Sequence, residues 1–84
     1  MKRTEVKELM DTLNRYREFN YALLLHEDVF SGEILTTYIL SPDSFEIHRW
    51  LEQKMAMLKK CDVPYVGYIN GTFEDSNNKI IFED

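Results

Sequence analysis

The sequence has little cysteine, glycine or proline. Cys61 is the one cysteine among 84 residues, so no disulfide can form within the chain. With His26 and His48 it makes up the soft or borderline metal ligands, and no two of these three residues lie at a ligand spacing such as C-x-x-C or H-x-x-x-H. Three glycines and two prolines are too few for a low-complexity chain. We expect an ordered domain without a disulfide, a metal ion or a cofactor.

Long apolar runs are also missing. The longest, Tyr21–Leu25, has five residues, far short of the roughly 18 that a membrane-spanning helix needs. The first residues, MKRTEVKELMDTLNRY, lack the apolar centre of a secretory signal. These two absences predict a cytoplasmic protein with no membrane partner.

Basic residues are absent from the middle of the chain. No Lys or Arg occurs between Arg17 and Arg49, whereas residues 21–48 contain five Asp or Glu. The net charge of the whole chain is −5. A surface that binds phosphates needs clustered cations, so we expect no direct contact with nucleic acid.

Two segments have the periodicity of an amphipathic helix. The shorter is expected to run from Thr4 to Arg17, with Thr4 as its N-cap. The longer is expected from Ser41 to Cys61: serine caps it, proline takes the first helical position, and Pro64 ends the helical stretch. One face of the longer helix is apolar and consists of Ile47, Trp50, Leu51, Met55, Leu58 and Cys61.

The remaining segments have the composition of strands. Asn20–His26 and Glu33–Leu40 are rich in bulky apolar residues and are predicted to form a hairpin that is apolar on both faces. A third strand is expected from Pro64 through Phe73, and a fourth at Lys79–Phe82. Asn70-Gly71 and Ser76-Asn77-Asn78 compete as the turn between them, and we favour the later one.

The predicted order of elements is α-β-β-α-β-β in a single domain over residues 1–84. This order is typical of an α+β fold, here a two-layer sandwich with both helices on one face of a mostly antiparallel four-stranded sheet. The connection through the long helix predicts that the second and third strands run parallel as a pair. The order of the strands in the sheet stays open.

Few residues are candidates for chemistry. His48 is expected to cap the core, and Cys61 to be a small buried residue at the end of the long helix, so catalysis by either is the least favoured hypothesis. Lys54 falls near the centre of the apolar arc. Either its stem packs while the ammonium group reaches water, or this part of the helix borders an interface.

The favoured hypothesis is a small non-catalytic interaction protein, an adaptor or an inhibitor. Its acidic loops would dock on a basic surface of another protein, with charge steering the encounter and aromatic residues supplying most of the binding energy. The sharper version is a phage-type inhibitor of an enzyme that handles nucleic acid. The predicted partner-binding residues are Glu27, Asp28, Phe30, Glu33, Phe73, Glu74 and Asp75.

The alternative hypothesis is a homo-oligomeric module that senses or binds a small molecule. A hairpin that is apolar on both faces calls for cover by a second copy of the chain. The ligand would then lie between sheet edge and helix, near Tyr38, Lys54 and Tyr68.

Overall fold

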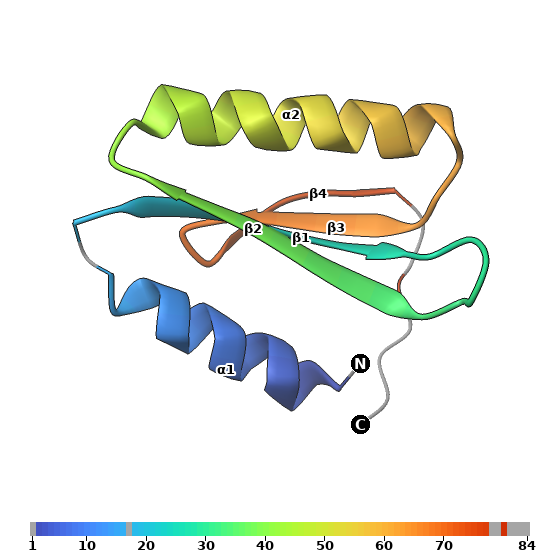
Figure 1. Ribbon diagram of the computed structural model, residues 1–84, viewed down its shortest axis with the longest axis horizontal. Helices are drawn as coiled ribbons and strands as arrows, with labels where there is room; N and C mark the ends of the chain where they lie inside the picture. Colours follow the sequence, from blue (N-terminus) through green and yellow to red (C-terminus); the bar gives the residue numbers. More distant parts are fainter. Residues whose placement is uncertain (1, 17, 78–79, 81–84) are drawn as a thin grey trace.

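The computed structural model describes residues 2–16, 18–77 and 80. The described part is an α+β fold with the predicted order of elements, α-β-β-α-β-β (Figure 1). Neither helix is long and apolar enough to cross a membrane, as judged over the described residues. The elements are α1 (Arg3–Asn14), β1 (Asn20–Glu27), β2 (Ile34–Ser41), α2 (Ser44–Lys60), β3 (Tyr65–Ile69) and β4 (Thr72–Asn77).

The four strands form one open sheet in the order β2-β1-β3-β4, and every neighbouring pair is antiparallel. Strand β1 therefore lies inside the sheet, and its residues Tyr21–Leu25 are all buried. The prediction that the second and third strands pair with each other is wrong. They do run in the same direction, but β1 lies between them and α2 carries the chain across it.

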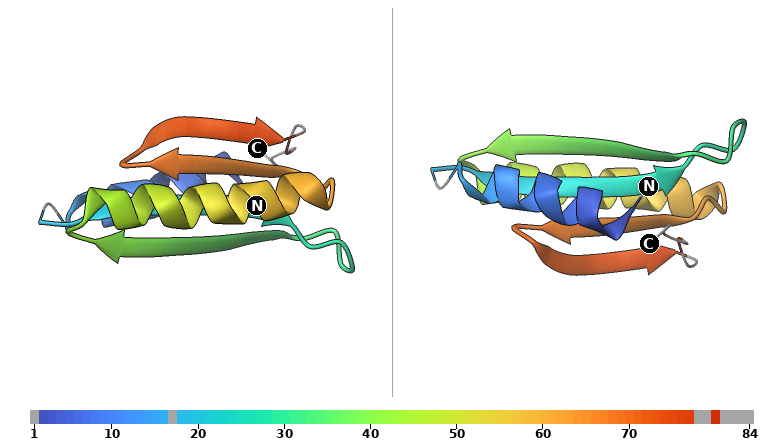
Figure 2. Two further views of the ribbon diagram at one scale, coloured as in Figure 1. Left: turned by 90° about the horizontal axis from the view of Figure 1, so that it is seen from above. Right: turned by 90° about the horizontal axis from the view of Figure 1, so that it is seen from below.

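The two helices lie on opposite faces of the sheet (Figures 1 and 2). Alternate residues of β1 belong to different cores, because successive side chains of a strand point to opposite faces. The core on the α1 face contains Val6, Leu13, Tyr21, Leu23, Leu25 and Val66. The core on the α2 face contains Ala22, Leu24, Ile47, Leu51, Tyr65 and Ile69.

This arrangement has three layers, so the prediction of a two-layer sandwich with both helices on one face is wrong. The physical reason lies in β1 itself. Its side chains are apolar on both faces, and each face needs an apolar cover to be removed from water. One helix on each side supplies both covers.

Helix α2 begins later than predicted. Its N-cap is Asp43, whose Oδ1 accepts hydrogen bonds from the backbone N–H groups of Phe45 at 2.9 Å and Glu46 at 3.4 Å. Ser41 instead ends β2, and its hydroxyl donates to Glu46 Oε2 at 2.9 Å and accepts from the Asp43 N–H at 3.1 Å. The three side chains form a joint between strand and helix. Helix α1 also differs, because its N-cap is Lys2 and not Thr4.

The turn between the last two strands is Asn70-Gly71, so the preference for the later turn was wrong. Both residues have positive φ, 52° and 84°. A two-residue hairpin loop of this kind matches the twist of the flanking strands, and the Asn-Gly dipeptide adopts it readily. The predicted fourth strand, Lys79–Phe82, lies outside the described residues except for Ile80, which packs against the core on the α1 face.

Gly67 in β3 lets α2 approach the sheet closely. A Cβ at this position would lie 2.8 Å from Met55 Sδ and 3.2 Å from both methyl groups of Leu51. Leu51 is buried, so it has little room to move away.

We therefore expect Gly67→Val to destabilise the fold by about 1–3 kcal/mol, although valine is favoured in strands. Urea denaturation followed by circular dichroism measures the change. Thr72→Val on the exposed strand β4 is the matched control and should leave stability within about 0.5 kcal/mol. A Gly67→Val protein as stable as the wild type would mean that α2 does not pack this closely.

Candidate functional site

The loop between β1 and β2 projects beyond the end of the sheet (Figures 1 and 2). We call residues 27–33 the hairpin tip. The Asp28 N–H donates to the Glu33 carbonyl and the Gly32 N–H to the Asp28 carbonyl, both at 2.7 Å. Asp28 Oδ1 accepts from the Phe30 N–H at 3.0 Å, and Ser31 Oγ accepts from the Glu33 N–H at 3.2 Å. The loop is thus held by bonds among its own residues.

This ordered loop presents an apolar ring to water. Phe30 is 97% exposed, and its neighbour Val29 is also exposed. Three carboxylates flank this ring in the sequence: those of Glu27, Asp28 and Glu33. The structure therefore brings four of the seven predicted partner-binding residues together on the tip: Glu27, Asp28, Phe30 and Glu33.

The other three predicted partner-binding residues lie elsewhere, on β4 at the far edge of the sheet from β2. Phe73 packs edge-to-face on Tyr68, with ring centroids 6.2 Å apart. Asp75 Oδ2 accepts a hydrogen bond from the Tyr65 hydroxyl at 3.3 Å. Glu74 and Asp75 also line a groove of about 260 Å³ against α2, together with His48 and Glu52. The predicted single acidic end is therefore two separate regions.

The residues of the predicted ligand site do not converge either. Tyr38 and Tyr68 are both in register with Leu23, which places them on the α1 face of the sheet. Lys54 is on α2, across the sheet from them. Its ammonium group lies 5.9 Å from the centroid of the Trp50 ring and the residue is exposed, in keeping with a packed stem and a solvated charge.

His48 and Cys61 lie near opposite ends of α2, about 20 Å apart along the helix axis. His48 is exposed, and its Nδ1 is 2.8 Å from the Ser44 carbonyl oxygen. Cys61 is exposed as well, so the prediction that it is buried was wrong. It is the C-cap residue, one position beyond the last helical residue, and the chain leaves the helix at Asp62, whose φ is 56°. In the described part of the chain no three potential metal ligands come together.

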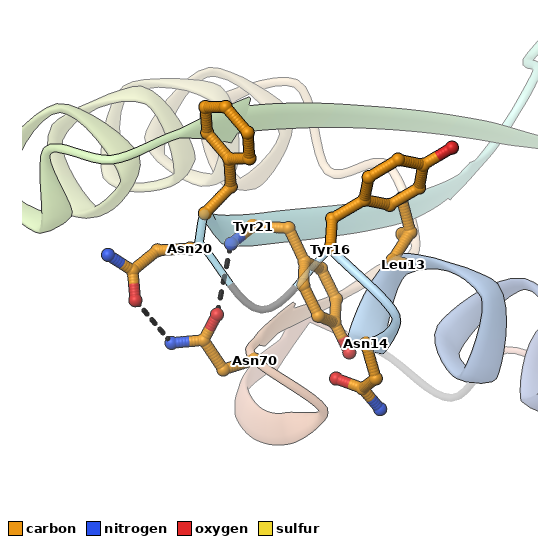
Figure 3. Close-up of a pocket in the computed structure, with 7 residues that line it drawn as sticks. Leu13, Asn14, Tyr16, Asn20, Tyr21 and Asn70 are labelled. Carbon is orange, nitrogen blue, oxygen red and sulfur yellow. Dashed lines mark hydrogen bonds between the residues drawn. The ribbon is translucent and has the colours of Figure 1, made fainter.

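A cavity of about 250 Å³ that the sequence did not suggest lies where α1, the start of β1 and the β3–β4 turn meet (Figure 3). Asn70 joins these segments. Its Oδ1 accepts from the Tyr21 N–H at 2.9 Å, and its Nδ2 donates to Asn20 Oδ1 at 3.0 Å. Its backbone N–H donates to the Tyr21 carbonyl at 3.0 Å. The lining residues are Leu13, Asn14, Tyr16, Phe19, Asn20, Tyr21 and Asn70.

The Tyr21 hydroxyl at this cavity is buried and has no hydrogen-bond partner among the described residues. Burial raises the pKa of the phenol above 10.0; the Asn14 side chain beside it lowers the pKa, and the negative charge of Asp11 raises it again. Burial also raises the pKa of Tyr68. The pKa of Tyr65 is raised by burial and by the nearby Asp75 carboxylate. The cavity is better explained as a structural junction than as a reactive site, because two of its three asparagines are occupied in holding the turn.

Comparison of the chain with family models, curated proteins and solved structures found no match. The function is therefore inferred from geometry and chemistry.

Asn70 provides a test of the junction. Asn70→Ala removes the two side-chain hydrogen bonds, to the Tyr21 N–H and to Asn20 Oδ1, and places alanine at positive φ, so we expect a loss of about 1–3 kcal/mol of unfolding free energy. Asn70→Gly relieves the backbone and removes the same side-chain bonds, so it should lose less than alanine does. Urea denaturation compares the two. Equal stability of Asn70→Ala and the wild type would contradict the proposed junction.

The tyrosines predict an alkaline limit of stability. A raised pKa in the folded state means that the unfolded chain releases the proton first, near pH 10.0. The stability that the buried tyrosines contribute should therefore be fully present below pH 10.0. It should be lost as pH rises through their pKa values in the folded state. Unfolding free energies between about pH 8 and pH 11 measure this loss. Tyr21→Phe removes a buried, unpaired hydroxyl and should make the decline shallower; a constant free energy across the range would refute the prediction.

Proposed function

We propose that this protein is a non-catalytic interaction module that docks through the hairpin tip on a basic surface of another protein. The observation that carries the proposal is Phe30, an exposed aromatic ring on a loop held by its own hydrogen bonds. A ring in this position adds nothing to the core of its own chain. Buried on a partner, it would form the kind of aromatic anchor that dominates many interfaces.

The hydrogen bonds that hold the loop in one conformation favour binding. A flexible loop loses conformational entropy when it docks, at about 0.5–1.5 kcal/mol for each immobilised side chain, whereas a loop already held in place loses less. The side chain of Asp28 holds the backbone N–H of Phe30, so one acidic residue both shapes the tip and charges it.

The charge of the tip indicates the chemistry of the partner. Glu27, Asp28 and Glu33 lie in a stretch with no Lys or Arg between Arg17 and Arg49. A partner that fits would offer an apolar pocket for Phe30 with Lys or Arg around its rim. Complementary charge of this kind accelerates association and makes it sensitive to salt.

A basic surface that fits the tip could itself be a groove that binds nucleic acid, and the sharper form of the proposal is then an inhibitor that competes with nucleic acid. Competition by added DNA or RNA distinguishes this form from an adaptor. The exposed, unpaired thiol of Cys61 suits a reducing compartment, which supports a cytoplasmic setting.

The test uses the wild type and Phe30→Ala as baits in affinity capture. It then measures how tightly each of them binds the captured protein. We expect the wild type to retain a protein that Phe30→Ala loses, with affinity for the purified partner at least tenfold weaker. Phe45→Ala is the matched control, because Phe45 is 73% exposed on α2 and away from the tip.

A pair of charge reversals completes the design. Glu27→Lys with Glu33→Lys should slow association and weaken its dependence on salt, whereas Glu52→Lys with Glu74→Lys makes the same change in net charge at the groove beside α2. Capture that is the same for the wild type and Phe30→Ala, or equal effects of the two reversals, would overturn docking through the tip.

A further inference from the structure

The two edges of the sheet differ in how they are protected. Strand β4 has six residues, a register shift where it pairs with Gly67 and Tyr68, and two adjacent carboxylates, Glu74 and Asp75. Charge and irregular pairing are the usual means by which proteins keep sheet edges from associating. Strand β2 has neither: its eight residues, ILTTYILS, pair with β1 in regular register and carry no charge and no proline.

Backbone N–H and C=O groups of alternate residues in β2 point away from β1, toward the open edge of the sheet. Tyr21 uses its N–H and its carbonyl for Asn70, on the β3 side, and the Glu27 N–H donates to the Pro64 carbonyl at 3.0 Å, also on that side. In an antiparallel ladder the residue opposite such a position is not bonded to it, and its own N–H and C=O point the other way. Leu40 lies opposite Tyr21, and Ile34 lies opposite Glu27.

By the same alternation, Tyr38 also turns its backbone groups outward, since it lies opposite Leu23. A row of backbone donors and acceptors is matched by another strand, not by a helix or a flat surface. Tyr38 and Leu35 are 52% and 42% exposed, so apolar side chains remain open beside this edge on both faces of the sheet. The edge therefore fits an uncharged, apolar β-strand.

We propose that this strand is β2 of a second copy, paired antiparallel to form one continuous eight-stranded sheet. The sequence of β2 is complementary to itself. When Thr37 lies opposite Thr37 of the second copy, Leu35 faces Ile39 and Ile34 faces Leu40, each pair on one face of the sheet. Apolar pairs and threonine pairs placed directly opposite stabilise antiparallel strands.

Another register is less favourable. Pairing Tyr38 with itself would place Ile34, whose bonding groups point outward, opposite Pro42, which has no N–H to donate. Charge also favours β2 as the contact. The chain has a net charge of −5, and Ile34–Ser41 brings no like charges together, whereas pairing through β4 would bring Glu74 and Asp75 of both copies close to one another.

The pairing does not depend on docking by the hairpin tip, but it would arrange two tips. A two-fold axis at Thr37 points them toward opposite ends of the joined sheet. With a rise of about 3.3 Å per residue along the strand, the two copies of Ile34 would lie roughly 20 Å apart, with the tips beyond them. The dimer would then be bivalent toward a partner with repeated sites.

Sedimentation velocity of the full chain over a range of concentrations tests the association. We expect a reversible dimer, with the dissociation constant raised at least tenfold by Tyr38→Lys, because lysine on an edge strand opposes pairing. Phe73→Lys on β4 is the matched control, since Phe73 is 55% exposed on the opposite edge, and it should leave the dimer intact. Circular dichroism checks that both variants are folded.

Disulfide trapping tests the register. In the proposed pairing, Thr37 forms a non-hydrogen-bonded pair with Cα atoms about 4.5 Å apart, within the roughly 4.4–6.8 Å that a disulfide spans. In a Cys61→Ser background, Thr37→Cys should form a covalent dimer in glutathione disulfide at least tenfold faster than Phe73→Cys. A monomer at every concentration, or a dimer unaffected by Tyr38→Lys, would overturn the pairing; faster trapping at Tyr38→Cys than at Thr37→Cys would overturn its register.

Discussion

Strand β1 is apolar on both faces, and the rest of the structure depends on covering it. Leu23 and Leu24 are adjacent in sequence, yet they belong to different cores. Neither helix could cover both, because successive side chains of a strand point to opposite sides. The sheet supplies β2 and β3 as neighbours along the edges of β1, and α1 and α2 cover its two faces. Burial of β1 in this way leaves the edges of the two outer strands and the connecting loops open to other molecules, along with the outer faces of the helices.

The features that local chemistry determines could be predicted from the sequence. The order of elements and the α+β class follow from apolar periodicity, and α2 was placed by its apolar face and the prolines at its ends. Its start was misplaced because Ser41-Pro42-Asp43 contains two capping residues. Ser41 pairs with Asn20 as the last residue of β2, which leaves Asp43 to cap the helix. The Asn70-Gly71 dipeptide also signals its turn locally, and the error lay in predicting a third strand that continues through it to Phe73.

The features that depend on strand order could not be predicted. Glu33 directly precedes β2 and Glu74 lies in β4, and only the order β2-β1-β3-β4 places these two strands at opposite edges of the sheet. The predicted ligand site placed Tyr38 near Lys54 for the same reason: without the strand order, the sequence does not show that the sheet lies between them. The contact of Asn70 with Tyr21 joins residues 49 positions apart, and no local signal marks it. The hairpin tip was the part of the candidate site that sequence could identify, because its residues are contiguous.

The two proposed surfaces are products of the same constraint. With both faces of β1 covered within the chain, the hairpin that continues from it extends past the sheet and exposes Phe30, and its second strand becomes an edge. The measurement that tests this account most directly is nuclear Overhauser contacts from the methyl groups of adjacent leucines in β1. The account predicts contacts from Leu23 to side chains of α1 and from Leu24 to side chains of α2. Contacts from both helices to the same leucine, with the other facing water, would contradict it.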